Sequence, residues 1–185
     1  MNIIATSKEE ILQTCRELIR QQKGTTLNVR QVASACGVSV GTVYNYFDSK
    51  ADLVGAAVES VWNDIFRCEE QDDSFSDILS CIQWMFARME YGSRQYPGFF
   101  VLHSMSFAQQ GKSDGKQRMQ KTWQHMCEML CAVLRNDANI RSGAFDDSFT
   151  PEMMADLLFS LLLAASMRCD FSCDAVLQIA RRTLY

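Results

Sequence analysis

The sequence predicts an all-α protein, and three observations lead to that fold class. Its 185 residues include only 2 prolines and 9 glycines, too few for the many tight turns of a sheet-rich protein. Apolar residues recur at the three-to-four-residue spacing of one helix face. Hydrophobic residues make up 48% of the chain and charged residues 22%, which excludes a disordered protein because the chain has enough apolar surface to fold.

Cap residues mark the first four predicted helices. Ser7 with Glu10 three residues later is a capping box, which satisfies free backbone N–H groups at a helix start. Asn28 and Ser39 are residue types that favour the N-cap position, and Gly37 suits the left-handed position after a helix end. These signals predict helices over residues 7–22, 29–36, 40–47 and 50 to about 70.

The rest of the chain predicts about five further helices. Pro97 marks a helix start, and Thr150 precedes Pro151, which suits the first helical position. Ser172 is expected to cap the last helix. These helices cover approximately residues 75–94, 97–108, 116–135, 151–169 and 173–185. We therefore expect about nine helices, with a three-helix head followed by a helical body.

Residues 28–47, NVRQVASACGVSVGTVYNYF, have the pattern of a helix-turn-helix. Two short helices joined by a turn that contains glycine form this motif. Its second helix enters the DNA major groove, which is about 12 Å wide, so the first residues of that helix should be small or polar. Residues 39–42 are Ser, Val, Gly and Thr, which fits this requirement.

Aromatic and basic residues follow at the end of the motif. Val43 and Phe47, four residues apart, supply the buried pair of the second helix. Tyr44 and Tyr46 are then left to reach the sugar-phosphate backbone, and Lys50 opens the next helix, where the helix dipole also favours a phosphate. A short helical turn in any helical protein has the same spacing, so that alternative stays open.

The charge distribution supports a nucleic-acid partner for the head. The formal net charge is −4, yet residues 1–50 carry +2 and residues 51–185 carry −6. The charge of the contacting region matters more for DNA than the value for the whole chain.

The segment NVRQVASACGVSVGTVYNYFDSKADL resembles the DNA-binding segment of the TetR/AcrR family of transcriptional regulators. The positions that match are Val29-Arg30, Val32-Ala33, Gly37-Val38-Ser39, Gly41-Thr42-Val43-Tyr44, Tyr46-Phe47, Ser49-Lys50 and Leu53. Beyond them the resemblance is one of layout and length. Asn28, Cys36 and Val40 depart from the family's usual Thr, Ala and longer side chain.

The resemblance implies a DNA-binding domain over residues 1–50 and a ligand-binding and dimerisation domain over residues 51–185. It implies a repressor that binds a palindromic double-stranded operator as a homodimer. Arg30 and Thr42 would approach bases, while Lys50 would hold a phosphate together with the two tyrosines. The candidate DNA-binding residues are Asn28, Arg30, Ser39, Val40, Gly41, Thr42, Tyr44, Asn45, Tyr46 and Lys50.

The resemblance also implies a small-molecule inducer held among the middle helices and a dimer interface made by the last two helices. Large apolar side chains suit an apolar or aromatic ligand. The candidate ligand-binding residues are Trp84, Met85, Met89, Phe100, His103, Trp123 and Met126. The candidate dimer residues, on a helix that is apolar nearly all round, are Leu157, Leu158, Leu161, Leu162 and Ala165.

Other classes of protein are disfavoured. The chain has no GxGxxG, P-loop, HExxH or GxSxG motif and only 2 histidines, so we do not expect an enzyme. Its longest uncharged apolar-rich run, residues 157–167, is well short of the roughly 20 residues of a membrane span. With no signal-peptide pattern at the start, we expect a cytoplasmic protein with no membrane partner and no cofactor.

Two alternatives remain open. Cys127 and Cys131 are four residues apart near His125, and Cys36 lies inside the predicted head. These thiols, together with the pair at residues 169 and 173, would serve a regulator that senses oxidants or metals, although no CxxC pair is present and no metal site is predicted. A helical interaction module that binds protein rather than DNA is the second alternative.

Overall fold

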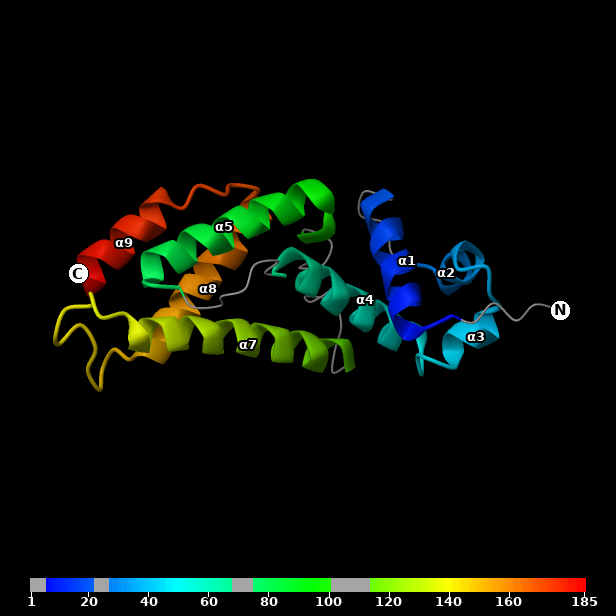
Figure 1. The fold of residues 1–185 in the computed structure, drawn as a ribbon, viewed down its shortest axis with the longest axis horizontal. Helices are drawn as coiled ribbons and strands as arrows, with labels where there is room; N and C mark the ends of the chain where they lie inside the picture. Colours follow the sequence, from blue (N-terminus) through cyan, green and yellow to red (C-terminus); the bar gives the residue numbers. More distant parts are fainter. Residues whose placement is uncertain (1–5, 22–26, 68–74, 101–113) are drawn as a thin grey trace. The chain divides into compact units, whose positions relative to one another are not determined.

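The computed structural model describes residues 6–21, 27–67, 75–100 and 114–185, with side chains left out over 114–122 (Figure 1). Within these ranges the protein is helical, and an isolated β-bridge joins Asp146 to Phe149. The helices are α1 (Lys8–Gln21), α2 (Val29–Ala35), α3 (Val40–Tyr44), α4 (Lys50–Ile65), α5 (Ile78–Gln95), α7 (Asp114–Asn136), α8 (Pro151–Arg168) and α9 (Asp174–Leu184). The predicted all-α fold is confirmed. The helix expected over 97–108 lies largely outside the described residues.

The chain packs as two compact units. The first comprises residues 1–64 and 94–122, and the second comprises residues 65–93 and 123–185. These are units of packing, and the functional division at residue 50 stays a prediction. None of the described helices is both long enough and apolar enough to span a membrane.

The first unit contains the three-helix head. Its core is made of side chains from α1 to α4 that are shielded from solvent, among them Ile11, Cys15, Val32, Val43, Phe47 and Leu53. The predicted capping box is confirmed, because Glu10 accepts a hydrogen bond from the Ser7 backbone N–H at 2.7 Å and the Ser7 hydroxyl accepts one from the Glu10 N–H at 3.2 Å. Gly37 has a φ of 68°, the left-handed conformation that the sequence predicts for it.

Helix α3, the second helix of the helix-turn-helix and its recognition helix, is shorter than the sequence predicts. α3 ends at Tyr44 rather than at residue 47. After Tyr44 the backbone bonding changes. The Asn45 N–H is shared between the carbonyls of Gly41 and Thr42, and the Tyr46 N–H donates to the Val43 carbonyl. Bonds to the carbonyl three residues earlier are common where a helix ends.

The second unit contains most of α5, the part of α7 from Trp123 onward, α8 and α9. Its solvent-shielded core includes Ile78, Cys81, Met89, Leu130, Met154, Leu162 and Leu184. α5 begins at Ile78 rather than at residue 75, because the Asp77 carboxylate accepts a bond of 2.7 Å from the Ser80 N–H. That bond lowers the pKa of Asp77. Ser172 was expected to cap the last helix, and this prediction is wrong, since Cys173 occupies the N-cap without a side-chain bond.

Candidate nucleic-acid interface

Buried apolar side chains hold the segment formed by α2, the turn and α3 in place, and we call them its anchor. Val32, Ala33, Val43 and Phe47 are all buried. The turn is closed by a 3.0 Å bond from the Val38 N–H to the Ala33 carbonyl. Because this anchor fixes α3 against α2, the opposite side of α3 faces outward as a rigid surface.

The first turn of α3 is open to a partner. Ser39 and Gly41 are exposed, and Val40 and Thr42 are half-buried. Ser39 caps the helix by accepting a bond of 3.0 Å from the Thr42 N–H, and the two hydroxyls lie 2.9 Å apart. A Cβ added at Gly41 would meet only the Ser39 Oγ, at 3.6 Å. Within the described part of the chain, nothing therefore obstructs close approach to the backbone at this position.

The remaining predicted DNA-binding residues also reach the surface, but two of them have partners within the chain. Arg30, Tyr44, Asn45 and Lys50 are exposed, with Tyr44 at 44%. Asn28, also exposed, caps α2 by accepting a bond of 3.0 Å from the Arg30 N–H.

Tyr46 is tied to the start of the chain. Its hydroxyl donates to the carbonyl of Thr6, in front of α1. A tyrosine hydroxyl has one hydrogen to donate, so in this arrangement Tyr46 has no hydrogen left for a phosphate oxygen. Lys8 adds a second link between α1 and the end of the motif, with its Nζ 5.4 Å from the centre of the Phe47 ring.

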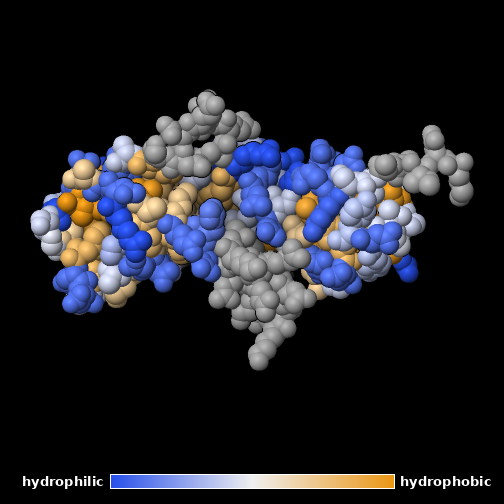
Figure 2. Space-filling view, turned by 60° about the horizontal axis from the view of Figure 1, so that its bottom comes forward, coloured by the Kyte–Doolittle hydropathy of each residue, from blue (hydrophilic) through white to orange (hydrophobic). Residues whose placement is uncertain are grey.

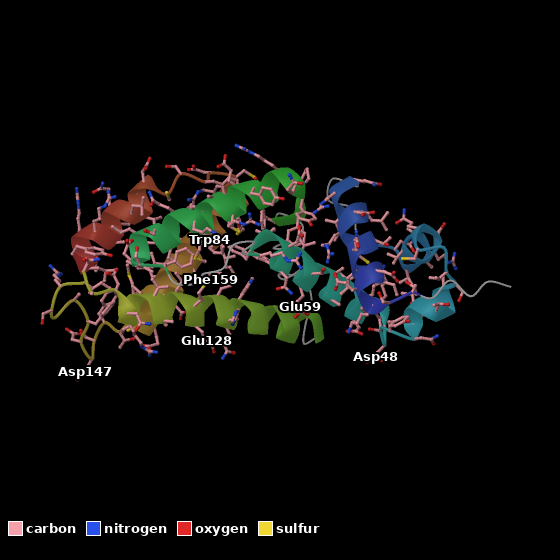
Figure 3. The ribbon with its side chains drawn as sticks, viewed as in Figure 1. Asp48, Glu59, Trp84, Glu128, Asp147 and Phe159 are labelled. Carbon is pink, nitrogen blue, oxygen red and sulfur yellow. The ribbon has the colours of Figure 1, made fainter. Side chains whose placement is uncertain are left out.

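A pair of capping bonds at the start of α4 was not among the sequence predictions. The Asp52 N–H donates to the Ser49 hydroxyl at 3.0 Å, and the Asp52 carboxylate accepts from the Asp48 N–H at 3.0 Å. Figure 3 labels Asp48 beside this helix start. The Ser-x-x-Asp spacing of residues 49–52 was the available signal. These bonds fix the first turn of α4, which carries Lys50.

The candidate ligand residues fall in both packing units. Trp84 on α5 is half-buried against the rings of Phe66 and Phe75, at 5.7 and 5.3 Å between ring centres. Trp123 on α7 packs edge-on against Phe159 of α8 at 5.8 Å; Figure 3 labels Trp84 and Phe159. Met85, Met89 and Met126 are buried in the same unit.

The other two candidate ligand residues stand apart from that group. Phe100 belongs to the first unit, where it packs on Trp62 with 5.6 Å between ring centres. His103 lies outside the described residues.

The candidate dimer residues divide into a buried and an accessible set. Leu158, Leu162 and Ala165 are buried by the chain's own helices, so a partner cannot reach them on the folded chain. Leu161 is half-buried and Leu157 is 44% exposed. Other large apolar side chains exposed on α8 and α9 are Met153, Met167 and Ile179. On the face shown in Figure 2, apolar residues come to the surface in small patches between polar ones.

Burial raises the pKa of two of the thiols named in the alternative reading, Cys127 and Cys131. Burial also raises the pKa of Cys15 and of Cys81, two core cysteines outside that reading, to about 12. It raises the pKa of Cys127 to about 11, and the Asp156 carboxylate, 3.6 Å from that sulfur, acts in the same direction. A thiol rather than a thiolate is a poor nucleophile. Among the described residues, no group of three or more His, Cys, Asp or Glu side chains is placed to hold a metal ion.

Comparison with known proteins agrees with the head geometry. Residues 11–57 match the model of the family described as bacterial regulatory proteins, tetR family. This span covers α1 from Ile11 onward, α2, α3 and the first half of α4. No curated sequence relative matches the chain.

Solved structures share the fold along nearly the whole chain. The transcriptional regulator FadR from Bacillus subtilis, solved in complex with stearoyl-CoA, is 15% identical with a TM-score of 0.72 over 97% of this chain and 100% of its own. A TetR-type transcriptional regulator from Streptomyces avermitilis is 20% identical, with a TM-score of 0.67 over 97% and 96% of the two chains. NemR of E. coli in its reduced form is 18% identical, with a TM-score of 0.62 over 96% and 97%.

The TM-scores establish a common fold along the chain. The match over residues 11–57 shows that the head, which contains the site described above, carries the sequence pattern of the bacterial regulatory proteins of the tetR family.

Proposed function

We propose that this regulator represses transcription by binding a palindromic operator as a homodimer, and that a small apolar or aromatic inducer releases it. The observation that carries the proposal is the α2–α3 surface, in which a buried apolar anchor supports an open helix turn. Val43 and Phe47 form the anchor, and Gly41 has only a serine hydroxyl near the place of a Cβ. A major-groove reader needs this combination of rigidity and access.

Within this proposal the exposed residues divide by task. Val40, Gly41 and Thr42 occupy the first turn of α3 and would face base edges, where an apolar side chain contacts a thymine methyl group. Tyr44 and Lys50 would bind phosphates. Tyr46 would hold the segment before α1 in place through its bond to the Thr6 carbonyl.

The dimer part of the proposal rests on the exposed apolar side chains of α8 and α9. Met153, Leu157, Met167 and Ile179 are each between 44% and 59% exposed. A two-fold dimer that covers them would present two recognition helices to a palindromic site, about 34–36 Å apart.

The inducer part rests on the aromatic and methionine side chains of the second unit. Trp84, Met85 and Met89 lie on α5, and Trp123 and Met126 lie on α7. Soft, large apolar side chains are the usual lining of small-molecule sites. The B. subtilis FadR structure, with its bound stearoyl-CoA, makes acyl-CoA thioesters a reasonable first class of compound to test.

The DNA-binding experiment compares Lys50→Ala and Thr42→Ala with wild type, on a duplex selected from random sequence and on an unselected duplex. Lys50→Ala should weaken binding to both duplexes and reduce the slope of log K against log salt by about one. Thr42→Ala should mainly reduce the preference for the selected duplex. Arg182→Ala, an exposed basic residue on α9, is the matched control.

An unchanged salt slope in Lys50→Ala would contradict the phosphate contact. Failure of the wild-type protein to bind any duplex would favour the helical interaction module instead.

A further inference from the structure

A triangle of polar side chains joins three distant parts of the first unit. Arg20 lies in the last turn of α1, Asp64 near the end of α4, and Tyr96 directly after α5. The Arg20 guanidinium donates to the Asp64 carboxylate at 3.0 Å and to the Tyr96 hydroxyl at 2.9 Å. The Tyr96 hydroxyl in turn donates to the same Asp64 oxygen at 2.6 Å.

The triangle depends on the chemistry of a hydroxyl group. The tyrosine hydroxyl accepts a bond from the guanidinium and at the same time donates one to the carboxylate, which a phenylalanine ring at this position could not do. Tyr96 is fully buried, and burial together with the bond to Asp64 raises the pKa of its hydroxyl, which keeps that hydrogen in place. The Arg20 guanidinium also lies over the Tyr96 ring, 4.8 Å from its centre.

The same short segment has a second hold on α4. Phe99 and Phe100 pack edge-on against Trp62, at 6.3 and 5.6 Å between ring centres. Trp62 is 2% exposed and lies two residues before Asp64. Residues 96–100 are thus fixed to α4 by aromatic packing and to both α1 and α4 by charged hydrogen bonds.

We propose that the segment of residues 96–100 sets the position of α1 in the DNA-binding unit, and that the Arg20–Asp64–Tyr96 triangle is the contact through which it does so. The inference rests on the proposed function, since its effect is read in DNA affinity. A displacement of this segment would break the triangle and release the end of α1. The other residues of α1 pack against the helix-turn-helix formed by α2 and α3. A ligand that prefers the displaced segment would lower DNA affinity through this contact, because a ligand shifts two states only by its differential affinity.

The test uses Tyr96→Phe, which keeps the ring beneath Arg20 and removes only the hydroxyl. Tyr91→Phe is the matched control, because Tyr91 is 41% exposed on the neighbouring turn of α5 and its ring contacts Arg88. Affinity for the selected duplex is measured at several salt concentrations, and hydrogen exchange is measured on wild type and variants with and without that duplex.

We expect Tyr96→Phe to lose about tenfold in affinity for the selected duplex, equivalent to roughly 1.4 kcal/mol, with an unchanged salt slope because no phosphate contact is lost. DNA should increase hydrogen-exchange protection at residues 94–100 in wild type and in Tyr91→Phe, and this response should vanish in Tyr96→Phe. Arg20→Gln, at a side chain that is 38% exposed, should reproduce both effects if Tyr96→Phe fails to fold.

A lowered melting temperature with wild-type affinity and exchange response would show a purely structural role and overturn the inference. If wild type binds the duplex and the variants bind it equally well, this inference is wrong and the proposed function is unaffected. If wild type binds no duplex, the proposed function falls and this inference falls with it.

Discussion

Gly92 on α5 is the position where the packing of the second unit makes the sharpest prediction. A Cβ added there would lie 2.7 Å from Ile65 Cδ1, 2.8 Å from Cγ1 and 3.1 Å from Cγ2. Ile65 ends α4, is fully buried, and its carbonyl accepts a hydrogen bond from the Arg88 guanidinium. Its side chain therefore has little freedom to move away from an added methyl group.

Two opposing effects set the size of the change in Gly92→Ala. Alanine stabilises a helix interior by about 1 kcal/mol relative to glycine, whereas overpacking a buried site costs about 1–3 kcal/mol. With three side-chain atoms of one fixed residue too close, the cost lies at the upper end. We expect Gly92→Ala to lower the free energy of unfolding by about 1–2 kcal/mol.

The sign should reverse when the obstructing side chain is removed. Ile65→Ala alone costs about 2–5 kcal/mol but deletes all three crowded atoms. In that background Gly92→Ala should raise the free energy of unfolding by up to about 1 kcal/mol, the helix-propensity gain alone.

Urea unfolding of the four proteins, followed by circular dichroism, measures this cycle. A loss of stability from Gly92→Ala in both backgrounds would show that Ile65 is not the obstruction and refute the reasoning.

Three further predictions concern the interface, the assembly and the acid response. Gly41→Ala should leave the urea midpoint of unfolding equal or higher, because the added Cβ meets nothing closer than 3.6 Å. The same change should weaken duplex binding in an electrophoretic shift assay, and unchanged binding would show that DNA contacts another surface. Leu157→Glu should give a folded monomer in light scattering, whereas Leu158→Glu, at a side chain only 3% exposed, should unfold the chain; a dimeric Leu157→Glu would exclude this face. The pKa of Asp137 lies below its ordinary value because the bonds from the Tyr185 hydroxyl and the Ile78 and Asn139 N–H groups outweigh burial. Its stabilisation is therefore complete above pH of about 4 and is lost as the pH falls through the lowered pKa, so Asp137→Asn should flatten the acid limb of an unfolding-versus-pH curve.

The head could be predicted from sequence because its signals are local. The capping box of Ser7 and Glu10, the N-caps at Asn28 and Ser39 and the left-handed Gly37 each depend on neighbours within a few residues, and each has the predicted geometry. The early end of α3 follows from a change in backbone bonding that residue spacing does not specify.

The two exposed tyrosines show where local reasoning stops. Sequence spacing assigned Tyr44 and Tyr46 the same task, since both follow the buried Val43 at the end of the motif. In the folded chain the Tyr46 hydroxyl donates to Thr6, forty residues earlier, and no local pattern records that partner. The same holds for Tyr96. Its hydroxyl bonds to Asp64, which lies 32 positions earlier in the chain, and to Arg20, which lies 76 positions earlier.

The sequence shows that α8 is apolar nearly all round, but its pattern could not say which side the chain covers itself. Leu157 and Leu158 are adjacent and chemically identical, yet one is 44% exposed and the other 3%. A helix turns by about 100° per residue, so neighbours face different surroundings. Which direction becomes core is decided by the other helices of the second unit rather than by α8.

Asp137 gives the physical reason why the body is harder to read than the head. Its carboxylate caps α5 by accepting a bond of 3.0 Å from the Ile78 N–H, 59 residues away, and it holds the hydroxyl of Tyr185, 48 residues away. An aspartate at the end of a predicted helix has no local signature that distinguishes such a partner from solvent. At 6% exposure, a carboxylate is stable only when its bonds are made, so this one residue fixes the start of α5, the end of α7 and the chain terminus together. The bonds of the head that the sequence predicted span three or four residues, whereas these bonds of the body exist only once the helices have packed.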